Sequence, residues 1–585
     1  MYRGLQRISG NPEGGRVTAL AFRGISGENR GFGRFSLVSM PSIAHTTRLT
    51  RTTGLRYWMQ RVLEECDRVA AGFEADPVHD LRVSIRRCRS MAVGLMALDP
   101  DPDWKAMKKA GKRLFQRLGA LRDVQIMMEW VEKLGPEIEG SADGKENGSS
   151  AATEMDQNRG DAEGLEDGEE HHHGHYSATQ TLMHILRARE QEQKLQAQSA
   201  LAEFDRKQWR HWSKSLPARA GRFHPGSALF KHVALERWTE ARALQTRTLH
   251  NRSGAAYHRL RIGIKRFRYI VENFLPAEHK AWSNDLKEMQ DLLGEVHDLD
   301  VLWETANSCH AFPDAESRER WHKRIIAERT KCIERYRARM TGPGSLWSVW
   351  RAALPQGKRI QLLGMRRMKL WANGLDPDSA HSERVTGLAL QLYDGLLALG
   401  WKSAIDDAAA RSSLQTAAWL HDVGKSQGEK CHHKASYDLI RAHGTPLGWK
   451  DADMQRAAIV ARFHCGALPT RKHKLLRDLL PHEQRAAIHL SAILRLANAF
   501  DVKHDGHIRR IYVGDKGKSG GAMRGESRNG FKHGGIMRDG SVFIAAEGYS
   551  PFGPNARAIA AERHLLETVL HRAVIVRAAK VAARS

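Results

Sequence analysis

The chain has 585 residues and a formal net charge of +25 at pH 7, from 92 Lys and Arg against 67 Asp and Glu. This length predicts several domains, and the charge favours a polyanionic partner: nucleic acid, an anionic membrane surface or polyphosphate. No apolar run approaches the roughly 20 residues of a membrane-spanning helix. The six cysteines form no CxxC pair, which argues against a zinc ribbon or a disulfide scaffold. We therefore expect a cytoplasmic protein.

Two stretches lack any apolar periodicity. Residues 1–45 are rich in Gly and Arg and predict a disordered basic extension, with Met40 as an alternative start. Residues 137–175 predict an acidic disordered insertion that ends in the tract HHHGH. Twelve acidic residues against two basic ones give residues 137–170 a net charge of −10.

Residues 46–350 show amphipathic helical periodicity and contain an internal duplication. HDLRVSIRRCR begins at His79 and HRLRIGIKRFRY begins at His258, 179 positions later. We place the two repeats at about 50–220 and 225–345. The cations that recur at matching offsets are His79, Arg82, Arg86, Arg87 and Arg89 in the first repeat, and His258, Arg261, Lys265, Arg266 and Arg268 in the second.

On a helix, the residues at offsets 0, 3, 7 and 10 of each motif lie within about 80° of one another. Like charges placed this way repel, and a multivalent anion removes that penalty. A solvated basic face with internal salt bridges is the alternative, but it does not explain two copies in register. Nucleic acid is the less favoured ligand, because no aromatic residues for base stacking alternate with the cations.

The duplication continues downstream. KRLFQRLGALRDVQ, which begins at Lys112, matches KEMQDLLGEVHDLD, which begins at Lys287. Leu-Gly and a following Asp recur in both. Lys112, Arg113 and Lys287 therefore join the candidate anion-binding residues.

A linker at 351–377 precedes a third helical block at 378–512. His and carboxylate residues recur through this block and suit a divalent metal, which can polarise a phosphoryl oxygen and acidify water. The predicted ligands are His381, His421, Asp422 and Asp501, with His433 and His464 as further candidates; Asp422, Lys425 and Arg462 are the predicted catalytic residues. Residues 513–585 predict a small α/β tail, in which strands flank a Gly-rich loop at 514–540 and a helix.

These motifs resemble two families. The repeated HxxRxxxRRxR with its downstream Leu-Gly resembles the CHAD domain, the conserved-histidine α-helical domain. That resemblance implies two pseudo-symmetric helical bundles whose basic residues line a groove that binds inorganic polyphosphate. The phrases AAWLHDVGK, HHKASYDLI, ARFHCGALP and ILRLANAFDVKH resemble HD-type phosphohydrolases, and more closely the C-terminal helical domain of the exopolyphosphatase/guanosine-pentaphosphatase family.

One position departs from the HD pattern: Asn498 stands where those enzymes carry an Asp. The sequence therefore leaves two functions open. One is a mainly α polyphosphate-binding protein whose HD-type domain hydrolyses a phosphoanhydride or phosphoester with Mn, Mg, Fe or Zn. The other is a non-enzymatic scaffold localised on polyphosphate, with a degenerate HD domain. Either would act in the cytoplasm, at polyphosphate granules, without a membrane partner.

Overall fold

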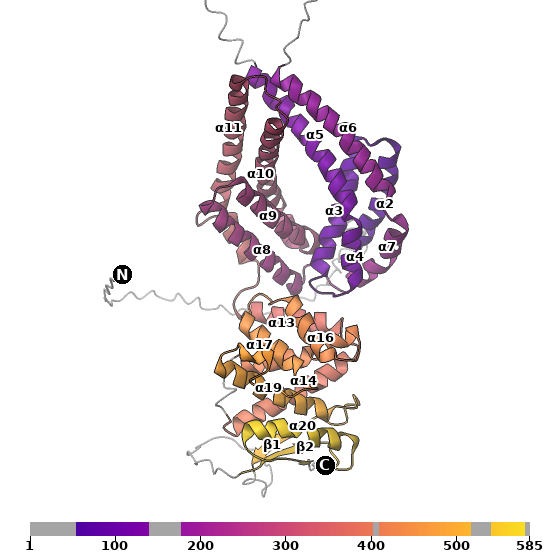
Figure 1. Ribbon diagram of the computed structural model, residues 1–585, viewed down its shortest axis with the longest axis vertical. Helices are drawn as coiled ribbons and strands as arrows, with labels where there is room; N and C mark the ends of the chain where they lie inside the picture. Colours follow the sequence, from indigo (N-terminus) through magenta and orange to yellow (C-terminus); the bar gives the residue numbers. More distant parts are fainter. Residues whose placement is uncertain (1–53, 140–176, 402–408, 516–539, 580–585) are drawn as a thin grey trace, which may run out of the picture. The chain divides into compact units, whose positions relative to one another are not determined.

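The computed structural model describes residues 54–139, 177–401, 409–515 and 540–579 (Figure 1). The predicted basic extension, nearly all of the acidic insertion and nearly all of the Gly-rich loop lie outside these residues. The fold is mainly α, as predicted, with one small three-stranded sheet near the C-terminus. Among the described helices, none is long and apolar enough to cross a membrane.

Both predicted repeats are helical. The first contains α2 (Leu55–Gly72), α3 (Ala75–Leu95), α4 (Pro102–Ala110), α5 (Lys112–Glu139), α6 (Ala178–Ala202) and α7 (Arg206–Ala220). The second contains α8 (Ala228–His250), α9 (Gly254–Phe274), α10 (Pro276–Ser308) and α11 (Ala315–Met340), followed by α12 (Leu346–Ala352). Each basic motif lies on the second helix of its repeat, α3 or α9.

The two basic helices pack against each other, while α5 pairs with α6 and α10 pairs with α11 (Figure 1). A close approach brings α3 and α9 together: a Cβ on Gly94 would lie 2.2 Å from the ring of Phe274. Beside it, the Asn273 amide donates a hydrogen bond to Ser90 Oγ at 2.9 Å. One continuous apolar core includes buried residues of both helices, so the two repeats fold as one body.

The third block is a separate helical core. Its elements are α13 (Lys358–Asn373), α14 (Ser379–Ala398), α15 (Ala410–Leu420), a short 3₁₀ helix η1 (Val423–Gln427), α16 (His432–His443), α17 (Asp451–Arg462), α18 (Lys474–Arg477) and α19 (Pro481–Phe500). The predicted linker at 351–377 contains α13, and Met368 and Trp371 of this helix are buried in the third-block core. The Pro and Gly residues that suggested a linker, such as Pro355, Gly357 and Gly374, flank α13 rather than interrupt it.

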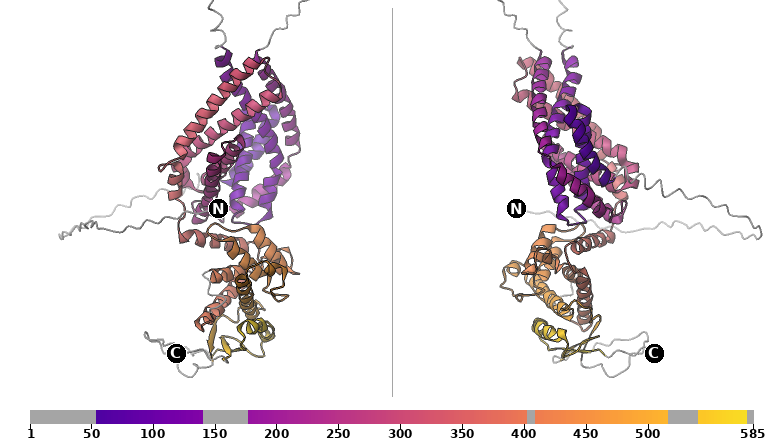
Figure 2. Two further views of the ribbon diagram at one scale, coloured as in Figure 1. Left: turned by 60° about the vertical axis from the view of Figure 1, so that its left-hand side comes forward. Right: turned by 90° about the vertical axis from the view of Figure 1, so that its right-hand side faces the viewer.

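The C-terminal sheet confirms the predicted strands. β1 (Ile511–Asp515) pairs antiparallel with β2 (Val542–Ala546), and β2 pairs parallel with β3 (Val574–Ala578). A parallel pair needs a crossover connection, which α20 (Pro554–Leu570) provides (Figure 2). Alternate residues of β2 are buried, and they belong to the same core as the third-block helices.

Candidate functional site

Four cations from the two repeats gather where α3 meets α9. Arg82 and Arg86 of α3 are close enough to Arg261 and Lys265 of α9 for mutual repulsion to act on their proton affinities. All four side chains are partly buried. Burial, followed by repulsion from the three arginines, lowers the pKa of Lys265 to about 7. We call these four residues the central cation cluster.

The Leu-Gly dipeptides explain how the arginines fit. A Cβ on Gly119 would lie 3.7 Å from Arg82 Nη2, and one on Gly294 would lie 3.9 Å from Arg261 Nε. The two guanidinium groups therefore lie against α5 and α10 at the glycines, at a distance where an added Cβ would be in ordinary van der Waals contact. This is a packing role for a motif that the sequence shows only as a repeat.

Acidic and histidine side chains border the central cation cluster. Asp123 Oδ1 lies 3.8 Å from Arg82 Nη2. Burial raises the pKa of Asp298 to about 6, although Arg261 opposes the shift. His258 and His297 stand with their Nδ1 atoms 3.3 Å apart, and burial lowers the pKa of His297 to about 4. His297 was not among the residues predicted from the sequence, although it aligns with Arg122 in the repeat.

Buried donors in the cluster lack partners. Arg86 Nε and Arg261 Nε are buried and form no hydrogen bond, and Arg89 Nη1 is in the same state. A buried polar group without a partner is costly. Phosphate oxygens would satisfy these donors, although arginine Nε atoms outside the cluster, such as those of Arg237 and Arg367, also lack a partner.

The remaining predicted groove residues differ in their surroundings. Arg87 turns away: it forms an ion pair with Glu272 and lies 5.3 Å from the Trp58 ring. Arg113 pairs with Glu203. Arg89 covers the Phe115 ring at 4.8 Å. Arg268 and His258 are partly buried. The other predicted groove residues are exposed: His79, Lys112, Arg266 and Lys287.

In the third block, the predicted metal-binding residues lie at helix ends. His381 is in the first turn of α14, where the Asp378 side chain caps its backbone N–H at 3.0 Å. His421 and Asp422 directly follow α15, and His464 follows α17. The ends of separate helices thus bring these side chains into one buried cluster: His381, His421, Asp422 and His464 are each at most 2% exposed.

Asp422 is the centre of this cluster. Its Oδ2 lies 2.7 Å from Lys425 Nζ, 3.4 Å from His421 Nε2 and 3.9 Å from His381 Nε2. The ligand atoms of His381, His421 and Asp422 are within 4.8 Å of one another, as a metal site requires. Three of the four predicted ligands therefore meet.

The fourth predicted ligand, Asp501, lies behind His381. It caps α19 and accepts hydrogen bonds from His381 Nδ1 at 2.8 Å, from Arg384 and from the Gly506 backbone. Asn498 Oδ1 instead lies 3.0 Å from His381 Nε2, on the side of the cluster. Asp501 thus orients His381, and the amide oxygen of Asn498, rather than the Asp501 carboxylate, lies beside the Nε2 atom of His381 that faces Asp422.

The other candidates divide between the cluster and its edge. His432, not selected from the sequence, lies with Nε2 3.3 Å from Asp422 Oδ1. Its neighbour His433 packs beside Gly466, at the edge. Arg462 is 9% exposed, lies 5.3 Å from the Phe463 ring and has an Nη1 without a hydrogen-bond partner. Two adjacent histidines at the start of α16 could not be distinguished by spacing alone.

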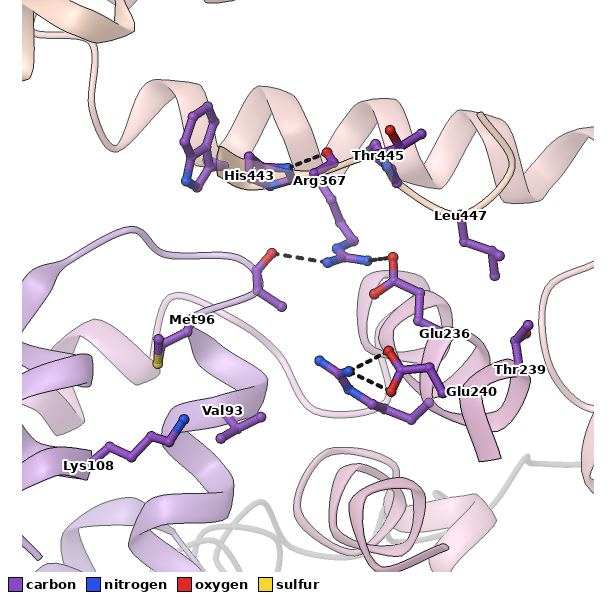
Figure 3. Close-up of a pocket in the computed structure, with 15 residues that line it drawn as sticks. Val93, Met96, Lys108, Glu236, Thr239, Glu240, Arg367, His443, Thr445 and Leu447 are labelled. Atoms are coloured by element: carbon purple, nitrogen blue, oxygen red, sulfur yellow. Dashed lines mark hydrogen bonds and ion pairs between the residues drawn. The ribbon is translucent and has the colours of Figure 1, made fainter. Parts of the chain in front are cut away.

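A cavity of the described residues lies away from both clusters. It has a volume of about 670 Å³ and is lined by residues of α3, α8, α13 and the segment after α16 (Figure 3). Two of its arginines are already paired, Arg367 with Glu236 at 2.6 Å and Arg237 with Glu240 at 2.7 Å. This mixed charge makes the cavity a poorer phosphate site than the central cation cluster.

Fold and sites define a helical protein with a duplicated, cation-rich helix pair joined to a His-Asp helical block. The CHAD domain family model matches residues 55–307. A second model, Ppx/GppA phosphatase, domain III, matches residues 367–518. The chain therefore carries a CHAD domain followed by a Ppx/GppA-type domain III, as its motifs suggested. No curated protein matches the chain.

Proposed function

We propose that the protein binds inorganic polyphosphate at the central cation cluster of its CHAD domain. The two matched domains indicate a polyphosphate-related function. The observation that carries the proposal is the meeting of four partly buried cations, two from each repeat: Arg82, Arg86, Arg261 and Lys265. A linear phosphate chain supplies closely spaced negative charge and needs no stacking surface, which favours it over nucleic acid.

We further propose that the Ppx/GppA-type domain hydrolyses a phosphoanhydride or phosphoester bond. His381, His421 and Asp422 would hold a divalent metal, because their ligand atoms converge and His421 Nε2 is buried without a hydrogen-bond partner. A bound metal of this kind acidifies water and polarises a phosphoryl oxygen. The Lys425 ammonium lies beside Asp422 and would neutralise part of the negative charge of an incoming phosphate. Arg462 has a guanidinium nitrogen without a partner, which would donate a hydrogen bond to the same phosphate.

A second function is supported by a specific observation. Lys425 already neutralises Asp422 Oδ2. In addition, the neutral amide of Asn498 lies beside His381, at the position where the HD enzymes that this domain resembles carry a carboxylate. Both features weaken a cation site beside His381. The alternative is a scaffold that localises on polyphosphate and uses the helical domain for binding only.

Incubation of the full chain with long-chain polyphosphate separates these functions. Binding and phosphate release are scored independently, with Mn²⁺, Mg²⁺, Fe²⁺ or Zn²⁺ added in turn. Binding with metal-dependent release that His421→Ala abolishes supports the hydrolase. Binding without release under any metal supports the scaffold, and absence of binding contradicts both.

A further inference from the structure

The cavity drawn in Figure 3 combines apolar and charged side chains. Its volume of about 670 Å³ lies within the range of about 300–1,000 Å³ that is typical of small-molecule sites. Val93, Met96 and Ala97, at and just after the end of α3, line it and are only partly buried, as is Leu447. A ligand that covers these atoms removes them from water, which stabilises a complex. The lining therefore favours a ligand with an apolar part.

The two ion pairs of the lining differ in how firmly they are held. Arg367 is 8% exposed; it pairs with Glu236 at 2.6 Å, and its Nη1 lies 2.9 Å from His232 Nδ1. This buried pair belongs to the packing of α13 against α8. Arg237 and Glu240 are one turn apart on α8, and the Glu240 side chain is 47% exposed. An exposed pair of this kind contributes only about 0–1 kcal/mol, so an incoming anion can replace Glu240 as the partner of Arg237.

Lys108 of α4 provides a second cation for such an anion. Figure 3 shows its side chain extending into the cavity beside Val93. Three arginines lie close enough to repel its ammonium group: Arg89, Arg266 and Arg237. Burial and this repulsion lower the pKa of Lys108, and within the described ranges it forms no ion pair. An anion against the Lys108 ammonium would relieve the repulsion.

We propose that this cavity binds a phosphate monoester with an apolar substituent, and that the phosphate lies between Lys108 and Arg237. A phosphate monoester carries a charge of about −1.5 to −2 at pH 7, which two cations match. The guanidinium fork of Arg237 donates to two phosphate oxygens, and Lys108 adds a point charge. The substituent covers Val93 and Met96.

This ligand differs from the one proposed for the central cation cluster. A long phosphate chain presents negative charge at every unit, and Glu236 and Glu240 in the lining would repel it. It also has no apolar part to cover the end of α3. The cavity is therefore a second site with its own ligand class, and its occupancy does not depend on polyphosphate binding.

Titration calorimetry of the full chain with hexyl phosphate tests the proposal. Wild type should bind one molecule per chain, and Lys108→Met should bind at least 10-fold more weakly, because it lacks a charge-assisted contact. Lys109→Met is the matched control, since Lys109 is exposed, adjacent and outside the lining, and should keep wild-type affinity. Arg82→Gln/Arg261→Gln should also keep it, because these arginines belong to the central cation cluster.

Val93→Trp is a second variant of the cavity. Its larger ring fills the space for the substituent and should abolish hexyl phosphate binding, with the fold checked by circular dichroism. Inorganic phosphate and hexanol carry one part of the ligand each, so each should bind wild type at least 10-fold more weakly than hexyl phosphate.

Three results would overturn the proposal: no binding of hexyl phosphate by wild type, wild-type affinity in Lys108→Met, or loss of binding in Arg82→Gln/Arg261→Gln. The last result would place the probe in the central cation cluster. Polyphosphate binding is measured separately on the same proteins, so failure of the cavity site and failure of the polyphosphate site are distinguishable.

Discussion

The charge of Lys265 depends on its burial and on the cations around it. Its pKa falls to about 7 because burial and Arg261, Arg86 and Arg82 all disfavour the ammonium form. Asp298 opposes this shift, but it is itself buried and has a raised pKa of about 6. A bound polyphosphate would reverse the balance, since its negative charge favours the protonated amine. Binding at the cluster should therefore take up a proton.

This linkage predicts a pH dependence. In the free protein Lys265 loses its proton as the pH rises through about 7, while phosphate binding requires the charged form. Polyphosphate affinity should then fall by up to about 10-fold per pH unit between pH 7 and pH 9. His297, with a pKa of about 4, is neutral throughout this interval, and Asp298 is ionised.

Lys265→Arg is the matched control for the pH effect, because an arginine stays charged at every pH of the assay. Titration calorimetry at pH 7, 8 and 9 should give a nearly constant affinity for this variant. An equally steep decline in both proteins would show that another group takes up the proton.

Adjacent arginines of α3 serve different purposes at the scale of the helix pair. Arg86 belongs to the cluster, where its charge acts on Lys265, and it lies 5.8 Å from the Tyr269 ring. Arg87 reaches across to α9, where it pairs with Glu272 and contacts Asn273. The first should contribute to ligand binding and the second to holding the repeats together.

Arg86→Gln and Arg87→Gln test this division. Arg86→Gln should weaken polyphosphate binding by about 10-fold or more with little loss of stability. Arg87→Gln leaves the Glu272 carboxylate, 8% exposed, without its partner, and should lower the free energy of unfolding by about 2–3 kcal/mol. Denaturant unfolding and binding assays on both variants check this. Loss of stability in Arg86→Gln together with loss of binding in Arg87→Gln would contradict this division of roles.

In the third block, Gly424 lets η1 pack on α16. A Cβ here would lie 2.1 Å from the His432 carbonyl oxygen and 2.5 Å from the Ser436 nitrogen, both backbone atoms. Ser436 reinforces the contact: its hydroxyl accepts from Gly424 N–H and donates to the His421 carbonyl oxygen. The glycine after His421-Asp422 therefore sets the position of His432.

Gly424→Ala should displace α16, destabilise the third block by about 1–3 kcal/mol and reduce the amount of divalent metal bound by the third block, while polyphosphate binding by the CHAD domain persists. Gly387→Ala is the control, since a Cβ on this helical glycine meets nothing within 4 Å and alanine is the better helix former. Metal analysis and thermal unfolding of the two variants would refute the packing role if both behaved alike.

Across the whole molecule, the sequence predicted what depends on repeats and periodicity. The helical class, the two basic helices and the C-terminal strands are confirmed because each follows from an apolar or charged pattern along the chain. The sequence did not predict the contacts that depend on the direction in which a side chain points. Arg87 and Arg86 are adjacent and equally basic, and only the packing of α3 on α9 sends one to Glu272.

The convergence of the candidate metal-binding residues was partly predictable for the same reason. His381, His421 and Asp422 were predicted and do converge. Asp501 was predicted as a ligand from its helical spacing to Asn498, but α19 ends at Phe500, and the carboxylate turns back to His381 Nδ1. His432 lies beside Asp422, but its approach depends on where α15 ends and α16 begins, and no local sequence pattern gives those positions.

The measurement that most directly tests polyphosphate binding compares wild type with Arg82→Gln/Arg261→Gln, which removes one arginine of the cluster from each repeat. Wild type should bind long-chain polyphosphate with an affinity that falls steeply with salt. The double variant, with its fold checked by circular dichroism, should lose about 100-fold or more in affinity, at about 1.5–3 kcal/mol for each charge-assisted contact. Wild-type affinity in that variant would contradict the assignment of the polyphosphate site to the central cation cluster.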